Sequence, residues 1–137
     1  MLSTLVMAAI SYVWHGLALT DIADLRMDLW RYLGLSGIAY LAIGLGLTLL
    51  VHFMLGRELI SLKGPFPFKA MFLGGVAGLM VYLIILVSGF SFASRGVQHA
   101  VVDLLWQVVE QGVGGLMVGL GIVYDMHRSF MEAEQAR

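Results

Sequence analysis

The stretch "HAVVDLLWQVVEQGVGGLMVGLGIVY" (residues 99–124) decides the fold of this chain. It is long enough to cross a bilayer, since about 20 mostly apolar residues cover about 30 Å of hydrocarbon. It nevertheless carries two carboxylates, Asp103 and Glu110, together with His99 and Gln107. At about 3.6 residues per turn, these four side chains fall on one face of a helix. The stretch therefore predicts a membrane helix with a single polar face.

The composition of the whole chain is that of a membrane protein. Of its 137 residues, 60% are hydrophobic and 12% are charged, whereas about a quarter of the residues of a soluble domain are charged. The net charge is -1 and the Lys and Arg residues are scattered, which argues against a nucleic-acid partner. The chain has no cysteine, which excludes disulfides, thiolate metal sites and cysteine nucleophiles. The lipid bilayer is the predicted environment.

Four segments are long and apolar enough for membrane helices, and they cover about residues 2–19, 32–55, 70–93 and 99–124. Lipid offers no partner for an unpaired backbone N–H, so each segment is expected to be helical. We expect one all-α domain, an integral membrane four-helix up-down bundle with short loops. A polar tail over 125–137 follows it, and the first segment is interpreted as a retained helix rather than a signal peptide.

The connections refine this topology. Pro65 and Pro67 place the link between the second and third helices at 56–69, because proline ends a helix. The link over 94–98 is short, so the third and fourth helices are predicted to be antiparallel neighbours.

Basic residues predict the orientation in the membrane. Five of them fall on one side and three on the other: Arg57, Lys63, Lys69, Arg128 and Arg137 against Arg26, Arg31 and Arg95. Because cytoplasmic loops carry the excess of Lys and Arg, both termini are predicted to be cytoplasmic. Trp14, Trp30 and Trp106 fall toward the opposite interface, as in an aromatic belt, although the depth of Trp106 also fits packing inside the bundle.

Small residues four positions apart indicate where helices could approach closely. Three such pairs occur, and they are Ala42 with Gly46, Gly74 with Gly78, and Gly115 with Gly119. They are the predicted helix-packing positions.

The depth of the polar face limits what it can do. A charged side chain at the bilayer centre costs about 2.5 to 3.5 kcal/mol on insertion scales, so the face should not meet lipid. It is expected to face the bundle interior, a partner subunit or a water-filled cavity. Glu110 lies about 10 Å deeper than Asp103, close to the midplane. No Lys or Arg of the chain shares that depth, so Glu110 is either a neutral, hydrogen-bonded acid or is paired with another molecule.

The histidines allow a further hypothesis. His15 falls on the same side of the membrane as His99 and Asp103, so His15 and His99 are the candidate ligands or relay groups for a haem or a metal. The motifs of di-iron bundles and of zinc hydrolases, Glu-x-x-His pairs and H-E-x-x-H, do not occur.

Three classes of function remain. The preferred one is a non-catalytic accessory or assembly subunit that binds other membrane subunits or its own copies, because 137 residues leave little room for both a pathway and a gate. The alternatives are a small proton- or ion-coupled carrier using Asp103 and Glu110, and a redox membrane protein that holds haem or metal through His15 and His99. The first class makes the chain a protein without enzymatic activity.

Overall fold

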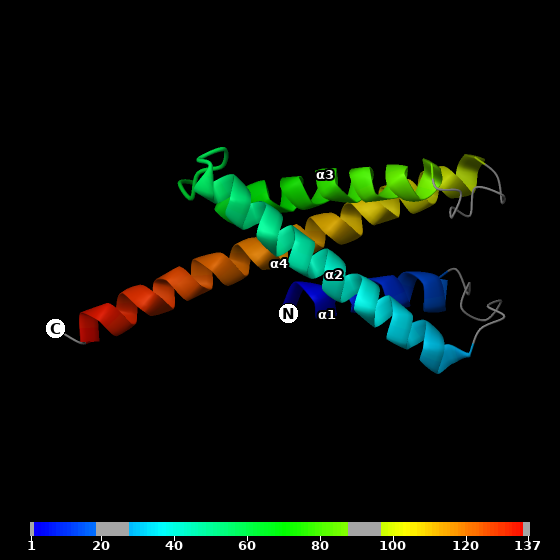
Figure 1. Ribbon diagram of the computed structural model, residues 1–137, viewed down its shortest axis with the longest axis horizontal. Helices are drawn as coiled ribbons and strands as arrows, with labels where there is room; N and C mark the ends of the chain where they lie inside the picture. The colour runs from blue at the N-terminus through cyan, green and yellow to red at the C-terminus, as the bar shows by residue number, and fades with distance from the viewer. Residues whose placement is uncertain (1, 19–27, 88–96, 136–137) are drawn as a thin grey trace.

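The computed structural model describes residues 2–18, 28–87 and 97–135, and Figure 1 shows how their helices are arranged. Helix α1 (Leu2–Tyr12) continues into a short π-helical segment, η1 (Val13–Ala18). Three longer helices follow, α2 (Leu29–Gly56), α3 (Phe66–Val87) and α4 (Val97–Gln135). Within these ranges the chain contains helices and no strand, which confirms the predicted all-α class.

Helix α4 is the centre of the arrangement, because every other helix packs on it. Helix α3 lies antiparallel along its first half, as the short link between them predicts, while α2 crosses over its middle (Figure 1). Helix α1 fills the space beside α2 and α4. The buried apolar core forms where these helices meet the middle of α4, and it consists of Met7, Leu47, Val51, Phe66, Ala70 and Val118.

Within the described part of the chain, three helices have the length and hydropathy of membrane spans, namely α2, α3 and α4. The apolar part of the N-terminal helix, Leu2–His15, is shorter. Helix α1 has 11 residues and η1 has 6. At about 1.5 Å per residue, the two segments together are about 25 Å long, which is shorter than the roughly 30 Å of hydrocarbon. The structure thus shows three helices of spanning length where the sequence predicts four.

The helix bounds differ from the predicted ones where prolines and polar residues lie. Helix α3 begins at Phe66 rather than at residue 70, because Pro67 stands in its first turn, where a missing N–H costs no hydrogen bond. Gly64, with a φ of 74°, makes the turn that leads into it. The predicted end of the third helix, residue 93, lies outside the described residues.

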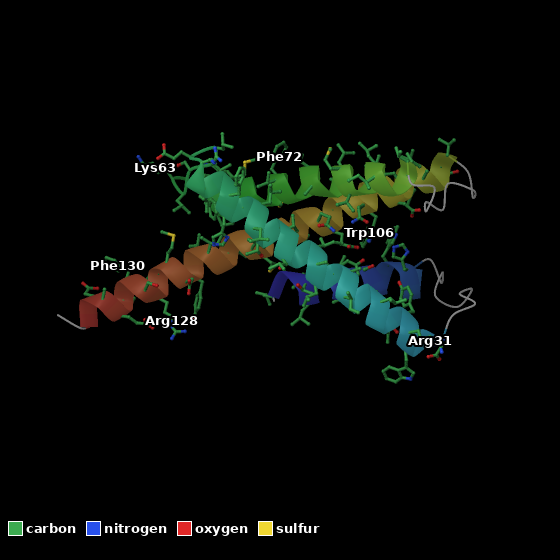
Figure 2. All side chains as sticks on the ribbon, in the orientation of Figure 1. Arg31, Lys63, Phe72, Trp106, Arg128 and Phe130 are labelled. Atoms are coloured by element: carbon green, nitrogen blue, oxygen red, sulfur yellow. The ribbon has the colours of Figure 1, made fainter. Side chains whose placement is uncertain are left out.

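Residues 125–135 of the predicted polar tail are a direct continuation of α4. The whole of α4 has 39 residues, so it is about 58 Å long, nearly twice the hydrocarbon thickness. The last turns therefore project beyond the other helices (Figure 1). An ion pair between Arg128 Nε and Glu132 Oε1, 2.7 Å apart, lies along this projection. Figure 2 shows Phe130 and Arg128 on different sides of it.

Candidate functional site

The polar face of α4 points into the protein rather than toward lipid. Glu110 is only 1% exposed, and Asp103 and Gln107 are half-buried. His99 belongs to the first turns of α4, but its side chain lies outside the described part of the structure. The face that the sequence predicts is thus covered by helices of the same chain over Asp103, Gln107 and Glu110.

Three helices contribute the groups around the Glu110 carboxyl. Ser11 of α1, Tyr40 of α2 and Trp106 of α4 all interact with it. The Tyr40 hydroxyl donates a hydrogen bond to Ser11 Oγ, so the proton of Ser11 remains available to the carboxyl. Among the described residues, Glu110 Oε1 has no hydrogen-bond partner. Glu110 therefore lies among polar groups of three helices of its own chain, which leave one of its two carboxyl oxygens unpaired.

Close packing of α1 brings Ser11 to this place. Ser3, Met7 and Ser11, spaced four residues apart, form the buried side of α1. Two glycines let this side approach its neighbours, since a Cβ at Gly44 would meet the side chains of Ser3 and Thr4, and a Cβ at Gly114 would meet Met7. Ser11 and Tyr40 were not among the residues predicted from the sequence. The eight-residue spacing of Ser3 and Ser11, which places both serines on one side of α1, was the available signal.

Two tryptophans lie on the same side of α4. Trp14 of η1 stacks on Trp106, with ring centroids 4.1 Å apart and ring planes at 11°. The rings of these two residues thus pack on each other between η1 and α4. Trp30, at 79% exposed, does lie on the surface. Trp106 takes the internal position that its depth also allowed.

The histidines are less informative. His15 is half-buried in η1, beside Trp14. Its predicted partnership with His99 lies outside the described side chains. Among the side chains that the structure describes, which leave out that of His99, no three of His, Asp or Glu gather as metal ligands. His52, with Nδ1 2.8 Å from the Thr48 carbonyl oxygen, lines a shallow hollow of about 330 Å³ near Asp125, away from Glu110.

The predicted glycine pairs behave in two ways. Gly74 and Gly78 of α3 and Gly115 and Gly119 of α4 lie at the contact between these two helices. A Cβ at Gly74 would collide with the carbonyl oxygen of Gln111, and one at Gly115 with that of Ala70. The backbones of α3 and α4 are therefore in direct contact.

The third pair does not pack within the chain. Ala42 and Gly46 are exposed on α2, and a Cβ at Gly46 would meet nothing within 4 Å. The prediction of a helix contact at this pair is thus wrong inside the chain, because α2 turns its other side, with Gly44 and Leu47, toward the core.

Gln111 is a buried polar residue that the sequence analysis missed. It is 0% exposed, and its side-chain Cβ and Cγ fill the space over Gly78. Its amide nitrogen and oxygen have no partner among the described residues. Its place one turn after Gln107 was the available signal. The polar residues of α4 thus divide, with Glu110 facing α1 and α2, and Gln111 facing α3.

No family model, curated protein or solved structure matches this chain. The chemistry of the site is therefore the guide to its role. A buried carboxyl group next to a serine and a tyrosine hydroxyl can join helices through hydrogen bonds, or it can bind and release a proton.

Proposed function

We propose that this chain is a small multi-pass membrane protein that serves as a non-catalytic accessory or assembly subunit of a larger membrane complex. The observation that carries the proposal is the large surface that the chain leaves uncovered. Within the most apolar windows of α2 and α4, only 17% and 33% of the residues are buried. The polar groups, in contrast, are enclosed, since Glu110 is 1% exposed. The polar groups thus contact helices of their own chain, while the apolar outer surfaces of α2 and α4 are available to bind helices of other subunits.

The uncovered side of α2 has the features of a helix-binding surface. Ala42 and Gly46 lie there one turn apart, with nothing of this chain near Gly46. In lipid, where helices gain little from hydrophobic burial, such small residues let a second backbone approach closely. The pair that is free in this chain is therefore available to a helix of another subunit.

The projection of α4 offers a second surface, outside the hydrocarbon. Tyr124, Phe130 and Met131 are exposed on it, and Arg128 and Glu132 occupy another side. Exposed apolar residues rimmed by charged ones are typical of protein-binding surfaces. This surface supports contact with a partner that extends into water.

Topology belongs to the same proposal. We infer that α1 and η1 complete a fourth crossing, which places both termini in the cytoplasm. Reporter fusions at Arg137 and within residues 20–31 should then report opposite sides of the membrane. The same side for both would show that one of the crossings is misassigned.

The subunit role can be tested in native membranes. The full chain is extracted in mild detergent, and the mass and visible absorption of the particle are recorded. We expect a particle heavier than the chain alone that contains other subunits. A lone chain would contradict the proposal, and a sharp Soret band would favour the redox hypothesis with His15 and His99 as haem ligands.

Two matched variants of α2 sharpen this test. Gly46→Leu fills the surface next to Ala42, whereas Gly37→Leu places the same side chain on the opposite side of the helix. Neither glycine has an atom within 4 Å of its Cβ position, so both variants should fold. Gly46→Leu should release the partner and Gly37→Leu should retain it. Retention by both would exclude this side of α2 as the binding surface.

A second candidate function, a proton-coupled carrier, is favoured by one specific observation. Asp103 Oδ1 and Glu110 Oε1 are buried without a partner in the described structure, and both residues lie on one face of α4. A carrier reconstituted alone in liposomes would conduct protons under an imposed membrane potential, and Glu110→Gln would abolish the current while the protein stays folded. The subunit proposal expects no current from the chain alone.

A further inference from the structure

Unpaired polar atoms gather on one side of α4. Within the described residues, buried side-chain atoms without a hydrogen-bond partner occur at Trp14 Nε1, Asp103 Oδ1, Trp106 Nε1, Glu110 Oε1 and the amide of Gln111. Each such atom destabilises the folded protein when it stays unpaired. In native proteins these atoms are almost always satisfied by protein groups or ordered water. Trp14, Trp106 and Glu110 lie where α1 and η1 meet α4. Asp103 lies two turns before Glu110 on the same face of α4, near Tyr82 of α3, and Gln111 faces α3.

The unpaired atoms are of two complementary kinds. The indole nitrogens of Trp14 and Trp106 can only donate a hydrogen bond, and the carboxylate oxygens of Asp103 and Glu110 can accept one. Trp106 stands between Asp103 and Glu110 on consecutive turns of α4, and Trp14 is stacked on it. Water both donates and accepts, so it can join donors and acceptors that do not reach each other.

We propose that the contact region between η1 and α4 binds a short chain of water molecules that runs from Asp103 past the indole N–H groups of Trp14 and Trp106 to Glu110. The two carboxyl groups are about 10 Å apart along the helix axis, a distance that about three waters cover at about 2.8 Å per hydrogen bond. Asp103 is half-buried and Glu110 is 1% exposed, so the chain of waters opens at Asp103 and ends at Glu110.

The local backbone suits such a site. Trp14 and His15 belong to η1, where the helix has π-helical geometry, and π-helical turns in proteins are frequently found at functional sites. The other titratable groups near the ends of the water chain are Tyr40 of α2, which interacts with Glu110, and Tyr82 of α3, which interacts with Asp103.

The water chain gives the buried acid access to protons. A proton leaves the Glu110 carboxyl for the adjacent water while another returns along the chain from the side of Asp103, so the exchange is neutral overall. This inference does not depend on the proposed subunit role, because the site lies within one chain. The water chain can be absent although a partner complex is found, and it can be present although no partner complex is found.

The three tryptophans of the chain allow a direct test. Each gives one indole N–H signal in a ¹⁵N spectrum of the full chain in lipid nanodiscs, and Trp106→Phe assigns its own signal. Trp30, 79% exposed, serves as the internal reference. We expect the indole protons of Trp14 and Trp106 to show cross-peaks to water and to exchange with D₂O within minutes. Protection of both for days, while Trp30 exchanges, would overturn the proposal without any variant.

A matched pair of variants tests where the water enters. Asp103→Leu replaces the acceptor at the mouth by an apolar side chain and should slow the exchange of both internal indoles by about tenfold. Asp125→Leu changes an exposed carboxyl on the projection of α4 and should leave both rates unchanged. Equal rates in Asp103→Leu and the wild-type protein would contradict an entrance at Asp103. An unchanged Trp30 indole signal, together with the near-ultraviolet circular dichroism of the stacked indoles, verifies that each variant is folded.

Discussion

Helix α4 packs against its neighbours in two different ways, which we call the glycine contact and the polar contact. In the glycine contact with α3, the backbones touch at Gly74 and Gly115. In the polar contact with α1 and α2, side chains meet instead, and Ser11, Tyr40 and Trp106 surround Glu110. One helix thus uses the two forces that hold helices together in lipid, close van der Waals packing on one side and hydrogen bonding on the other.

The glycine contact and the polar contact are expected to tolerate different kinds of substitution. A backbone contact cannot yield when an atom is added, because the opposing group is a carbonyl rather than a flexible side chain. The polar contact should depend on the kind of group present and accept changes that preserve hydrogen bonding. The glycine contact is therefore expected to hold the fold, and the polar contact to determine what α4 can bind or exchange.

The largest expected effect comes from breaking the glycine contact. Gly115→Ala places a methyl group against the carbonyl oxygen of Ala70, and overpacking of this kind costs about 3 kcal/mol of unfolding free energy. Gly46→Ala, where nothing lies within 4 Å, is the matched control and should not destabilise the protein. Denaturant titration in mixed micelles measures both. Equal stability of the two variants would show that α3 and α4 are not in backbone contact.

A smaller loss is expected when the aromatic part of the polar contact is removed. Trp106→Ala deletes the ring that stacks on Trp14 at 4.1 Å, and it should lower the unfolding free energy by about 2 kcal/mol. Trp30→Ala removes an exposed ring and should change little. The same titration distinguishes them, and near-ultraviolet circular dichroism should lose the signal of the stacked indoles only in Trp106→Ala. Equal losses would mean that the stack contributes nothing.

A hydrogen bond also joins α3 and α4. The Tyr82 hydroxyl donates to the carbonyl oxygen of Ala100 at 2.7 Å. Tyr82→Phe should therefore cost about 1 kcal/mol, whereas Tyr124→Phe, at an exposed position, should cost nothing measurable. If Tyr82→Phe is as stable as the wild-type protein, packing alone holds α3 and α4 together near Tyr82 and Ala100.

The sequence predicts the glycine contact better than the polar one. Hydropathy indicates α2, α3 and α4, and the short link between α3 and α4 makes them neighbours, so Gly74 and Gly115 are found by spacing. Spacing cannot tell that Ala42 and Gly46 face outward, because the rotation of α2 is decided by Gly44 and the core.

The partners of Glu110 were harder to predict. Periodicity shows that Glu110 lies on a polar face, but Ser11 and Tyr40 come from distant helices, and their approach depends on tertiary packing. Gln111 falls next to the predicted face, on the side of α3, and was overlooked for that reason. The π-helical turn that carries Trp14 has no recognisable sequence pattern.

The most direct test of the account concerns Glu110, which we interpret as a hydrogen-bonding group enclosed by its own chain. The measurement is the unfolding free energy of Glu110→Gln and Glu110→Ala in the same mixed micelles. Gln keeps the volume and nearly all hydrogen bonds, so it should stay within about 0.5 kcal/mol of the wild-type protein, whereas Ala should lose about 2 kcal/mol. A Gln variant as unstable as the Ala variant would contradict the account, because it would show that the polar contact requires an ionisable carboxyl group.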